Sequence, residues 1–250
     1  MSASPSLSQS TASCRSGSRT PEAHRRKCTR CSCFGPKHPS INLLFWQQTL
    51  YTTSMIKIRR PRSMQPIPPH AQVVFSGALF DLYQWEQEMF DGSTEIFEKV
   101  KRHHDTVNII PVTEDGKILI AEEQQPCTDP FIALIGGRVD PGEDPIDTAR
   151  RELREEAGYE ADELIIWNAY QPAGSKIDWA VYNFIAKRCR KVGEQILDPG
   201  ERISIREVDF EDFWKAMLDE RFRSHDVELM LLRMTQTPGE LEEFKDLLFN

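Results

Sequence analysis

Long apolar segments are absent from this 250-residue sequence. In its basic N-terminal part the longest one, residues 41–51, contains Gln47, Gln48 and Thr49 and is too short to cross a bilayer. No apolar stretch typical of a secretory signal follows the first methionine. We therefore expect neither a membrane-spanning helix nor a secreted protein.

Cysteine is scarce outside the N-terminal region. Of the six cysteines, only Cys127 and Cys189 lie beyond residue 33. Two cysteines do not indicate a disulfide framework in a domain of this size, and a reducing compartment such as the cytoplasm fits. Cys28, Cys31 and Cys33 could form half of a zinc site, but no second cysteine pair follows at a usable spacing.

Acidic residues are nearly missing from the N-terminal region and dominate the rest. Residues 1–62 hold eleven Lys and Arg but a single acid, Glu22, so they carry +10 and the remainder carries −18 of the net −8. The acidic remainder argues against stable nucleic-acid binding by the folded part. It does not argue against a nucleotide substrate, because a bound metal inverts the local charge.

Residues 1–69 are predicted to be a disordered head and linker, because they are rich in Ser, Pro and Arg and have little to bury. The same composition is typical of an organelle transit peptide, so import is the alternative to a cytoplasmic location. A further alternative is that translation begins at Met55 or Met64.

The stretch 137–159 predicts one helix with complete end signals. Asp144 can cap its first turn, and Pro145 suits the first helical position. Gly158 is placed to end the helix in a left-handed conformation. The spacing of the apolar residues predicts one buried stripe, made of Ile146, Ala149, Leu153 and Ala157.

Three acids, Glu152, Glu155 and Glu156, fall within about 100° of arc beside that stripe. Like charges at this spacing repel, and clustered carboxylates favour a hard cation such as Mg²⁺, with Mn²⁺ as the alternative. A solvated acidic face would explain the carboxylates alone. It would leave Arg151 and the Gly136-Gly137 pair unexplained.

The same stretch resembles the Nudix box, G-x5-E-x7-R-E-U-x-E-E-x-G-U, where U is a bulky apolar residue. The matching positions are Gly137, Glu143, Arg151, Glu152, Leu153, Glu155, Glu156, Gly158 and Tyr159. The resemblance implies a Nudix hydrolase that cleaves the diphosphate of a nucleoside diphosphate derivative. It also implies an α+β fold, an α/β/α sandwich with a mixed sheet.

The resemblance also assigns roles to residues of the box. Glu152, Glu155, Glu156 and the carbonyl of Gly136 would be metal ligands, with Glu155 also taking part in catalysis. Arg151 would orient a carboxylate by a charge-assisted hydrogen bond, and Glu143 would support the ligands from the loop.

The regions around the box resemble the ADP-ribose and nucleoside-diphosphate-sugar pyrophosphatase branch. Predicted strands precede the box, a region that forms a homodimer in that branch, and Gln171–Ser175 resembles its Pro-Gly turn. The loop from Gly193 to Glu201 resembles its catalytic loop, with Glu201 the first candidate for the general base and Glu194 the second. Glu122–Pro126 departs from the pattern, because the branch usually has Gln-Tyr-Arg there.

Candidate substrate contacts are Trp85 and Arg138. Among the aromatic residues Trp85, Trp167, Trp179 and Phe131, any ring could stack on a base, although a core position is the more ordinary interpretation. Arg138 could meet a phosphate or the solvent. The alternative substrates are dinucleoside polyphosphates, coenzymes and RNA 5′ ends. A nucleotide sensor without turnover is the alternative outside the enzymes, but such modules usually lose box glutamates.

Apolar patterning predicts the other elements. Strands are expected at Val73–Phe75, Ala78–Trp85, Thr94–Val100, Thr106–Val112, Ile118–Ala121, Phe131–Ile135, Leu164–Tyr170, Asp178–Ala186 and Ile203–Val208. Helices are expected at Glu211–Glu220, Asp226–Met234 and Glu240–Phe249. We thus predict one domain over 70–250, with N-terminal strands in 70–103, the core in 104–220 and C-terminal helices in 221–250.

Overall fold

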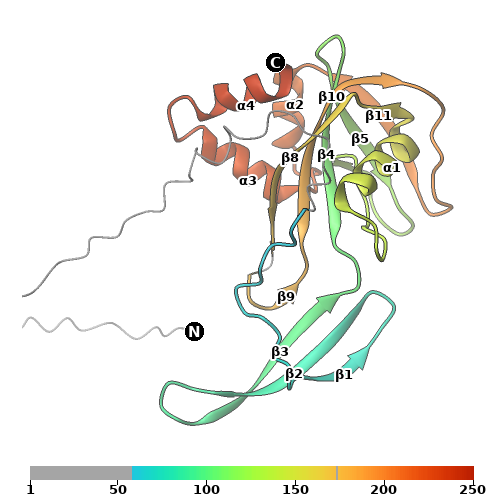
Figure 1. Ribbon diagram of the computed structural model, residues 1–250. Coiled ribbons are helices and arrows are strands. Elements are labelled where there is room, and N and C mark those ends of the chain that lie inside the picture. Colours follow the sequence, from blue (N-terminus) through green and yellow to red (C-terminus); the bar gives the residue numbers. More distant parts are fainter. Residues whose placement is uncertain (1–57, 173) are drawn as a thin grey trace, which may run out of the picture. The chain divides into compact units, whose positions relative to one another are not determined.

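The computed structural model describes residues 58–172 and 174–250 (Figure 1). The predictions for the head, its cysteine cluster and its import role lie mostly or wholly in residues 1–57, outside the described part, and remain predictions. No helix in the described residues is long and apolar enough to cross a membrane.

A first sheet contains the predicted N-terminal strands β1 (Gln72–Ser76), β2 (Phe80–Glu88) and β3 (Thr94–Arg102). They pair antiparallel in sequence order, and β9 (Ile177–Asp178) adds a parallel strand beside β3. Gly92, with φ +84°, lies in the turn between β2 and β3, where glycine avoids the steric cost of a left-handed conformation.

A second, larger sheet forms the centre of the domain. Its order is β11-β5-β4-β10-β7, with β8 beside β10 and β6 beside β5. Since β4 and β10 run parallel whereas the other pairs are antiparallel, the predicted mixed sheet is confirmed. Its strands are β4 (Thr106–Thr113), β5 (Ile118–Gln124), β6 (Phe131–Ala133), β7 (Tyr159–Glu160), β8 (Glu163–Tyr170), β10 (Val181–Lys191) and β11 (Arg202–Val208).

One strand prediction is wrong. Asp178–Ala186 was expected as a single strand, but the chain leaves the first sheet after β9 and enters the second at β10. The break falls at Trp179 and Ala180, where the backbone N–H of Ala180 donates to Asp105 Oδ1 over 2.8 Å. The two halves thus pair with different sheets, and only β10 pairs antiparallel with the strand at Glu163–Tyr170.

In the described part of the chain, four helices cover the second sheet: α1 (Pro145–Ala157), α2 (Phe210–Met217), α3 (His225–Met234) and α4 (Glu240–Phe249). In Figure 1, α1 lies on one face and α2 to α4 lie on the other. Two apolar clusters fill the layers. One joins α1 to Val107, Ile109 and Leu119, and the other joins α2 to α4 to Ile110 and Ile118.

Adjacent strand residues such as Ile109 and Ile110 point to opposite faces and are both fully buried. The central strands are therefore apolar almost throughout, as expected for a sheet covered on both sides. The α/β/α sandwich predicted from the Nudix resemblance is confirmed.

Candidate active site

Helix α1 begins and ends where the sequence predicts. Asp144 accepts a hydrogen bond from the N–H of Ile146 at 3.2 Å, and Pro145 occupies the start of the helix. Gly158 adopts φ +74° and donates its N–H to the carbonyl of Arg154. The caps thus define both ends of α1, and its buried stripe of Ala149, Leu153 and Ala157 determines which acids face the sheet.

Two of the three acids of α1 are buried. Glu152 and Glu156 are 8% and 7% exposed and lie beside the buried stripe of Ala149, Leu153 and Ala157. Glu155 is only partly covered. Because a buried carboxylate is costly unless it finds a donor or a cation, Glu152 and Glu156 require partners within this site.

Arg151 is the cation already present among these acids. Its Nη1 donates to Glu152 Oε1 at 2.8 Å and to Glu155 Oε2 at 3.0 Å. Its Nε and Nη2 donate to Glu143 at 3.3 and 3.2 Å, and Nη2 also donates to the carbonyl of Arg138 at 3.1 Å. The structure thus brings Arg151 together with the acids that it was predicted to orient.

Glu143 supports the start of α1 from the preceding loop. Besides the bonds from Arg151, it accepts one from the hydroxyl of Thr148 at 2.7 Å. Burial alone would raise its pKa, but these hydrogen bonds outweigh burial and lower the pKa of Glu143. Glu143 therefore stays ionised and holds the guanidinium of Arg151 in place.

Gly136 lies where the loop meets both the sheet and α1. Its N–H donates to Glu156 Oε2 at 2.9 Å, and its carbonyl accepts no backbone hydrogen bond from the described residues. A Cβ at this position would lie 2.1 Å from the carbonyl oxygen of Val107. Only glycine permits this close approach of the loop to β4, which brings the Gly136 N–H to Glu156.

Glu123 on β5 is a member of the site that sequence reasoning missed. Burial and the charge of Glu201 raise the pKa of Glu123 to about 7. Burial and the charges of Glu123, Glu152 and Glu201 raise the pKa of Glu156 to about 9, against the opposing effect of the hydrogen bond from Gly136. Four carboxylates therefore repel one another here, and we call Glu123, Glu152, Glu156 and Glu201 the carboxylate group.

The strand alternation could have indicated Glu123. Glu123 has the same parity in β5 as Leu119 and Ala121, which pack on the α1 side of the sheet. Its side chain therefore points to the face that carries Glu156.

The loop between β10 and β11 contains both candidate bases and places them in different surroundings. The N–H of Ile196 donates to the carbonyl of Glu155 at 2.7 Å, so this loop runs along the end of α1. Glu201, at its end, acts electrostatically on Glu123, Glu152 and Glu156. Glu194 is exposed and follows Gly193, which contacts Gly158 beyond the last turn of α1.

The donor set suits a hard divalent cation. Four carboxylates and the carbonyl of Gly136 supply only oxygen atoms, which Mg²⁺ prefers, and the mutual repulsion of the acids is what a cation would relieve. Within residues 58–172 and 174–250, no three His, Cys, Asp or Glu side chains converge on one point. Glu152 and Glu155 are turned toward Arg151 and Glu156 toward Gly136, so side-chain rotation would accompany metal binding.

The two candidate substrate contacts lie in different places. Arg138 is exposed, and its carbonyl accepts the hydrogen bond from Arg151, so it adjoins the box. Trp85 is 4% exposed and packs in the first sheet against Phe97, with ring centroids 6.0 Å apart. The structure gives Trp85 a place in the packing of that sheet and does not bring it to the carboxylate group.

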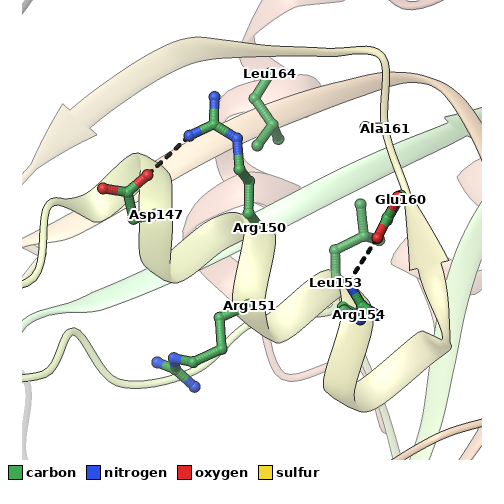
Figure 2. A pocket seen from close by; sticks show the side chains of 8 residues that line it. All are labelled: Asp147, Arg150, Arg151, Leu153, Arg154, Glu160, Ala161 and Leu164. Carbon is green, nitrogen blue, oxygen red and sulfur yellow. Dashed lines mark hydrogen bonds and ion pairs between the residues drawn. The ribbon is translucent and has the colours of Figure 1, made fainter. Parts of the chain in front are cut away.

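A separate pocket of about 510 Å³ lies along α1 and the segment 160–164 (Figure 2). Its arginines are already paired: Arg150 contacts Asp147 and Arg154 contacts Glu160, both at 2.8 Å. Arg151 points away from Arg150 in this view. This pocket therefore lies on another flank of α1 from the carboxylate group.

Comparison with known proteins agrees with this geometry. The NUDIX domain family model matches residues 102–230. The chain is 33% identical over 146 residues to an ADP-ribose pyrophosphatase of Bacillus subtilis (strain 168), covering 58% of this chain and 78% of that protein. It is 30% identical over 105 residues to the ADP compounds hydrolase NudE of Escherichia coli (strain K12), covering 41% and 56%.

A solved structure described as an ADP compounds hydrolase has a similar fold. Its TM-score is 0.57 at 19% identity, and the match covers 69% of this chain and 94% of that one. At this identity the likeness bears on the fold alone.

Proposed function

The chain belongs to the Nudix family and is a Nudix hydrolase, and from this premise we propose that it hydrolyses the diphosphate bond of ADP-ribose or a related nucleoside diphosphate sugar. The named activities of the Bacillus and Escherichia relatives support this substrate class. The observation that carries the proposal is the carboxylate group beside the Gly136 backbone, a set of oxygen donors for a cation that would bind a diphosphate.

Nudix hydrolases generally use divalent metals, and we propose Mg²⁺ here, with Mn²⁺ as the alternative. Glu152, Glu156 and the Gly136 carbonyl would hold it, with Glu155 joining after release from Arg151. The ion supplies positive charge that neutralises the phosphate oxygens and polarises the reacting phosphorus.

We assign the proton transfer to Glu201. In the proposed reaction a water oxygen forms a bond to one phosphorus, and the bond between that phosphorus and the bridging oxygen breaks, so that the bridging oxygen leaves with the other phosphate. Glu201 accepts the proton of that water, and the two products are phosphate monoesters. Arg151 holds Glu152 in place while Glu143 holds Arg151, so these two residues act by positioning.

The substrate is tested with a panel on the full chain in Mg²⁺: ADP-ribose, nucleotide sugars, dinucleoside polyphosphates, NADH and 5′-capped RNA. We expect the highest kcat/KM for ADP-ribose or a nucleotide sugar. The Glu156→Gln variant should show no turnover of these substrates. Preference for a dinucleoside polyphosphate, a coenzyme or RNA would move the assignment to that class. Binding of a nucleotide without turnover of any panel member would indicate a sensor and contradict the proposal.

We also propose that the chain forms a homodimer through its first sheet. The edge strand β1 is exposed over its whole length, and Val73, Val74 and Phe75 are each about half exposed. Leu79 and Phe80 are also exposed, and the Phe80 ring lies against Phe75 with centroids 6.3 Å apart. Exposed apolar side chains gathered on one edge strand are typical of a surface that another chain covers.

For location we propose the cytoplasm. Within the described residues, Cys127 and Cys189 are free thiols, which fits a reducing compartment. Imaging of the full chain against a chain that begins at Met55, each with a C-terminal fluorescent tag, tests this. Organelle staining that requires residues 1–54 would favour import instead.

A further inference from the structure

As placed in this structure, Arg151 has no N–H donor left for a substrate phosphate. An arginine has five N–H donors, and those of Arg151 are engaged by Glu143, Glu152, Glu155 and the Arg138 carbonyl. A diphosphate would enter a site where the acids already outnumber this one cation. The end of β5 offers no other, because residues 122–126 read Glu-Glu-Gln-Gln-Pro.

Arg223, in the connection between α2 and α3, is an unused cation near the same place. Its backbone N–H donates to the carbonyl of Ile132 at 2.9 Å, and the N–H of Ile132 donates to the carbonyl of Arg221 at 3.0 Å. These bonds hold the connection against β6. Within residues 58–172 and 174–250, the guanidinium of Arg223 forms no hydrogen bond and no ion pair.

The ring of Phe131 supports that guanidinium, whose central carbon lies 4.0 Å from the ring centroid. Phe131 is itself 7% exposed and is fixed in β6, so the stacked guanidinium has a defined place. A cation held over a rigid ring loses less conformational freedom when it binds an anion.

The pairing of β5 with β6 places Arg223 beside the carboxylate group. Phe131 lies directly opposite Glu123, and Ala133 lies opposite Ala121. Paired residues of an antiparallel ladder share a face, with Cβ atoms about 4.5–5.5 Å apart. The guanidinium over Phe131 is therefore on the side of Glu123, and its positive charge opposes the rise in the pKa of Glu123.

The place is open to a ligand. Arg223 lines a surface pocket of about 330 Å³, at the lower end of the range for ligand pockets. Arg221, in the same wall, is already bound to Asp219 at 2.8 Å. Arg223 is thus the arginine of this wall that remains available to an anion within the described residues.

We propose that Arg223 binds a phosphate oxygen of the diphosphate substrate, so that the connection between α2 and α3 forms part of the substrate site. The planar guanidinium can donate two parallel N–H bonds to phosphate, which a lysine cannot reproduce. This assignment rests on the proposed function only for the presence of a diphosphate, and not for the group attached to it.

The test is calorimetric binding of methylenediphosphonate, a diphosphate that cannot be hydrolysed, to the full chain with Mg²⁺. We expect Arg223→Ala to weaken binding by roughly 10- to 100-fold, the loss typical of a hydrogen bond to a charged group. Arg223→Lys should fall between Arg223→Ala and the wild type. The matched control is Arg233→Ala, which removes the same charge from an exposed position of α3 and should bind as the wild type does.

Equal affinity in Arg223→Ala and Arg233→Ala, or no binding of this diphosphate to the wild type, would overturn the assignment. Steady-state kinetics separate it from the proposed function. If Arg223→Ala hydrolyses ADP-ribose with an unchanged KM, the role of Arg223 is contradicted and the proposed function is kept. If methylenediphosphonate binding depends on Arg223 but no diphosphate is hydrolysed, the proposed function is contradicted and the role of Arg223 is kept.

Discussion

A side chain at Gly137 would collide with the carboxylate of Glu152. A Cβ placed there lies 2.3 Å from Oε1 and 2.7 Å from Oε2 of Glu152, well inside the contact distance of about 3.5–4.0 Å. Glycine at this position therefore decides how closely the loop approaches α1. It also limits the position of the buried Glu152 carboxylate.

Gly137→Ala should reduce activity with little loss of stability. The obstructed atoms belong to the end of a flexible side chain, so the Glu152 carboxylate can move aside and the fold can remain. That movement would break its 2.8 Å contact with Arg151 and displace a proposed metal ligand. We expect kcat to fall at least about 10-fold, as is usual for a misplaced group, while thermal unfolding shifts by only a few degrees.

Gly136→Ala is the informative comparison. Its Cβ would lie 2.1 Å from the carbonyl oxygen of Val107, which belongs to the central strand β4 and cannot rotate away. We expect a loss in unfolding free energy of about 3 kcal/mol or more, measured by urea denaturation. If the two glycine variants had the same stability, the distinction between side-chain and backbone obstruction would be wrong.

Glu156 should make the metal-free protein less stable as pH rises. Burial and neighbouring acids raise the pKa of Glu156 to about 9, so the folded state holds this proton more tightly than the unfolded state does. Its contribution to stability is fully present below the ordinary pKa of 4.5 and is lost as pH rises toward about 9. Glu156→Gln cannot ionise and should escape this loss.

Urea unfolding in EDTA near pH 5 and near pH 8.5 measures the effect, which we expect to be about 1–3 kcal/mol larger in the wild type than in Glu156→Gln. Glu211→Gln, an exposed acid of α2, is the control and should follow the wild type. Addition of Mg²⁺ should restore the wild type at the higher pH. The same pH dependence in all three proteins would show that Glu156 is not the titrating group.

The sequence was sufficient to predict α1 because its determinants are local. The cap at Asp144, the stop at Gly158 and the apolar stripe all act within one helix, and each lies where the pattern predicts. The acids of α1 then follow from helical geometry, since Glu152 and Glu156 lie on adjacent turns. Both are buried beside the stripe, as the arc of residues suggested.

Glu123 and Arg223 could not be found in this way. They lie 100 residues apart in the sequence, and only the pairing of β5 with β6, and of β6 with the connection before α3, brings them to one face. The split between β9 and β10 has the same cause. A continuous run of strand-forming residues does not reveal that its two ends pair with different sheets.

Glu201 should carry the general-base role and Glu194 should not. Glu201 lies at the loop end where its charge acts on Glu152 and Glu156, whereas Glu194 is exposed near Gly158. We expect Glu201→Gln to lower kcat by about 10²- to 10⁴-fold, and Glu194→Gln to change it little. The measurement is kcat of both variants and the wild type at several pH values. Equal effects of the two substitutions would place the base elsewhere.

Phe75→Glu should convert the proposed homodimer into a monomer. Phe75 is 53% exposed on the edge strand β1, and its ring contacts Phe80 with centroids 6.3 Å apart, so a carboxylate there would be buried in the proposed interface. Burial of an unpaired charge outweighs the contribution of most single interface residues.

Light scattering after gel filtration should give twice the chain mass for the wild type and a single chain mass for the variant. Leu229→Glu, at a similarly exposed apolar position of α3, is the control and should stay dimeric. A monomeric wild type would contradict the proposed homodimer. A dimer that survives Phe75→Glu would show that β1 is not the contact, because the introduced carboxylate would then remain exposed to water.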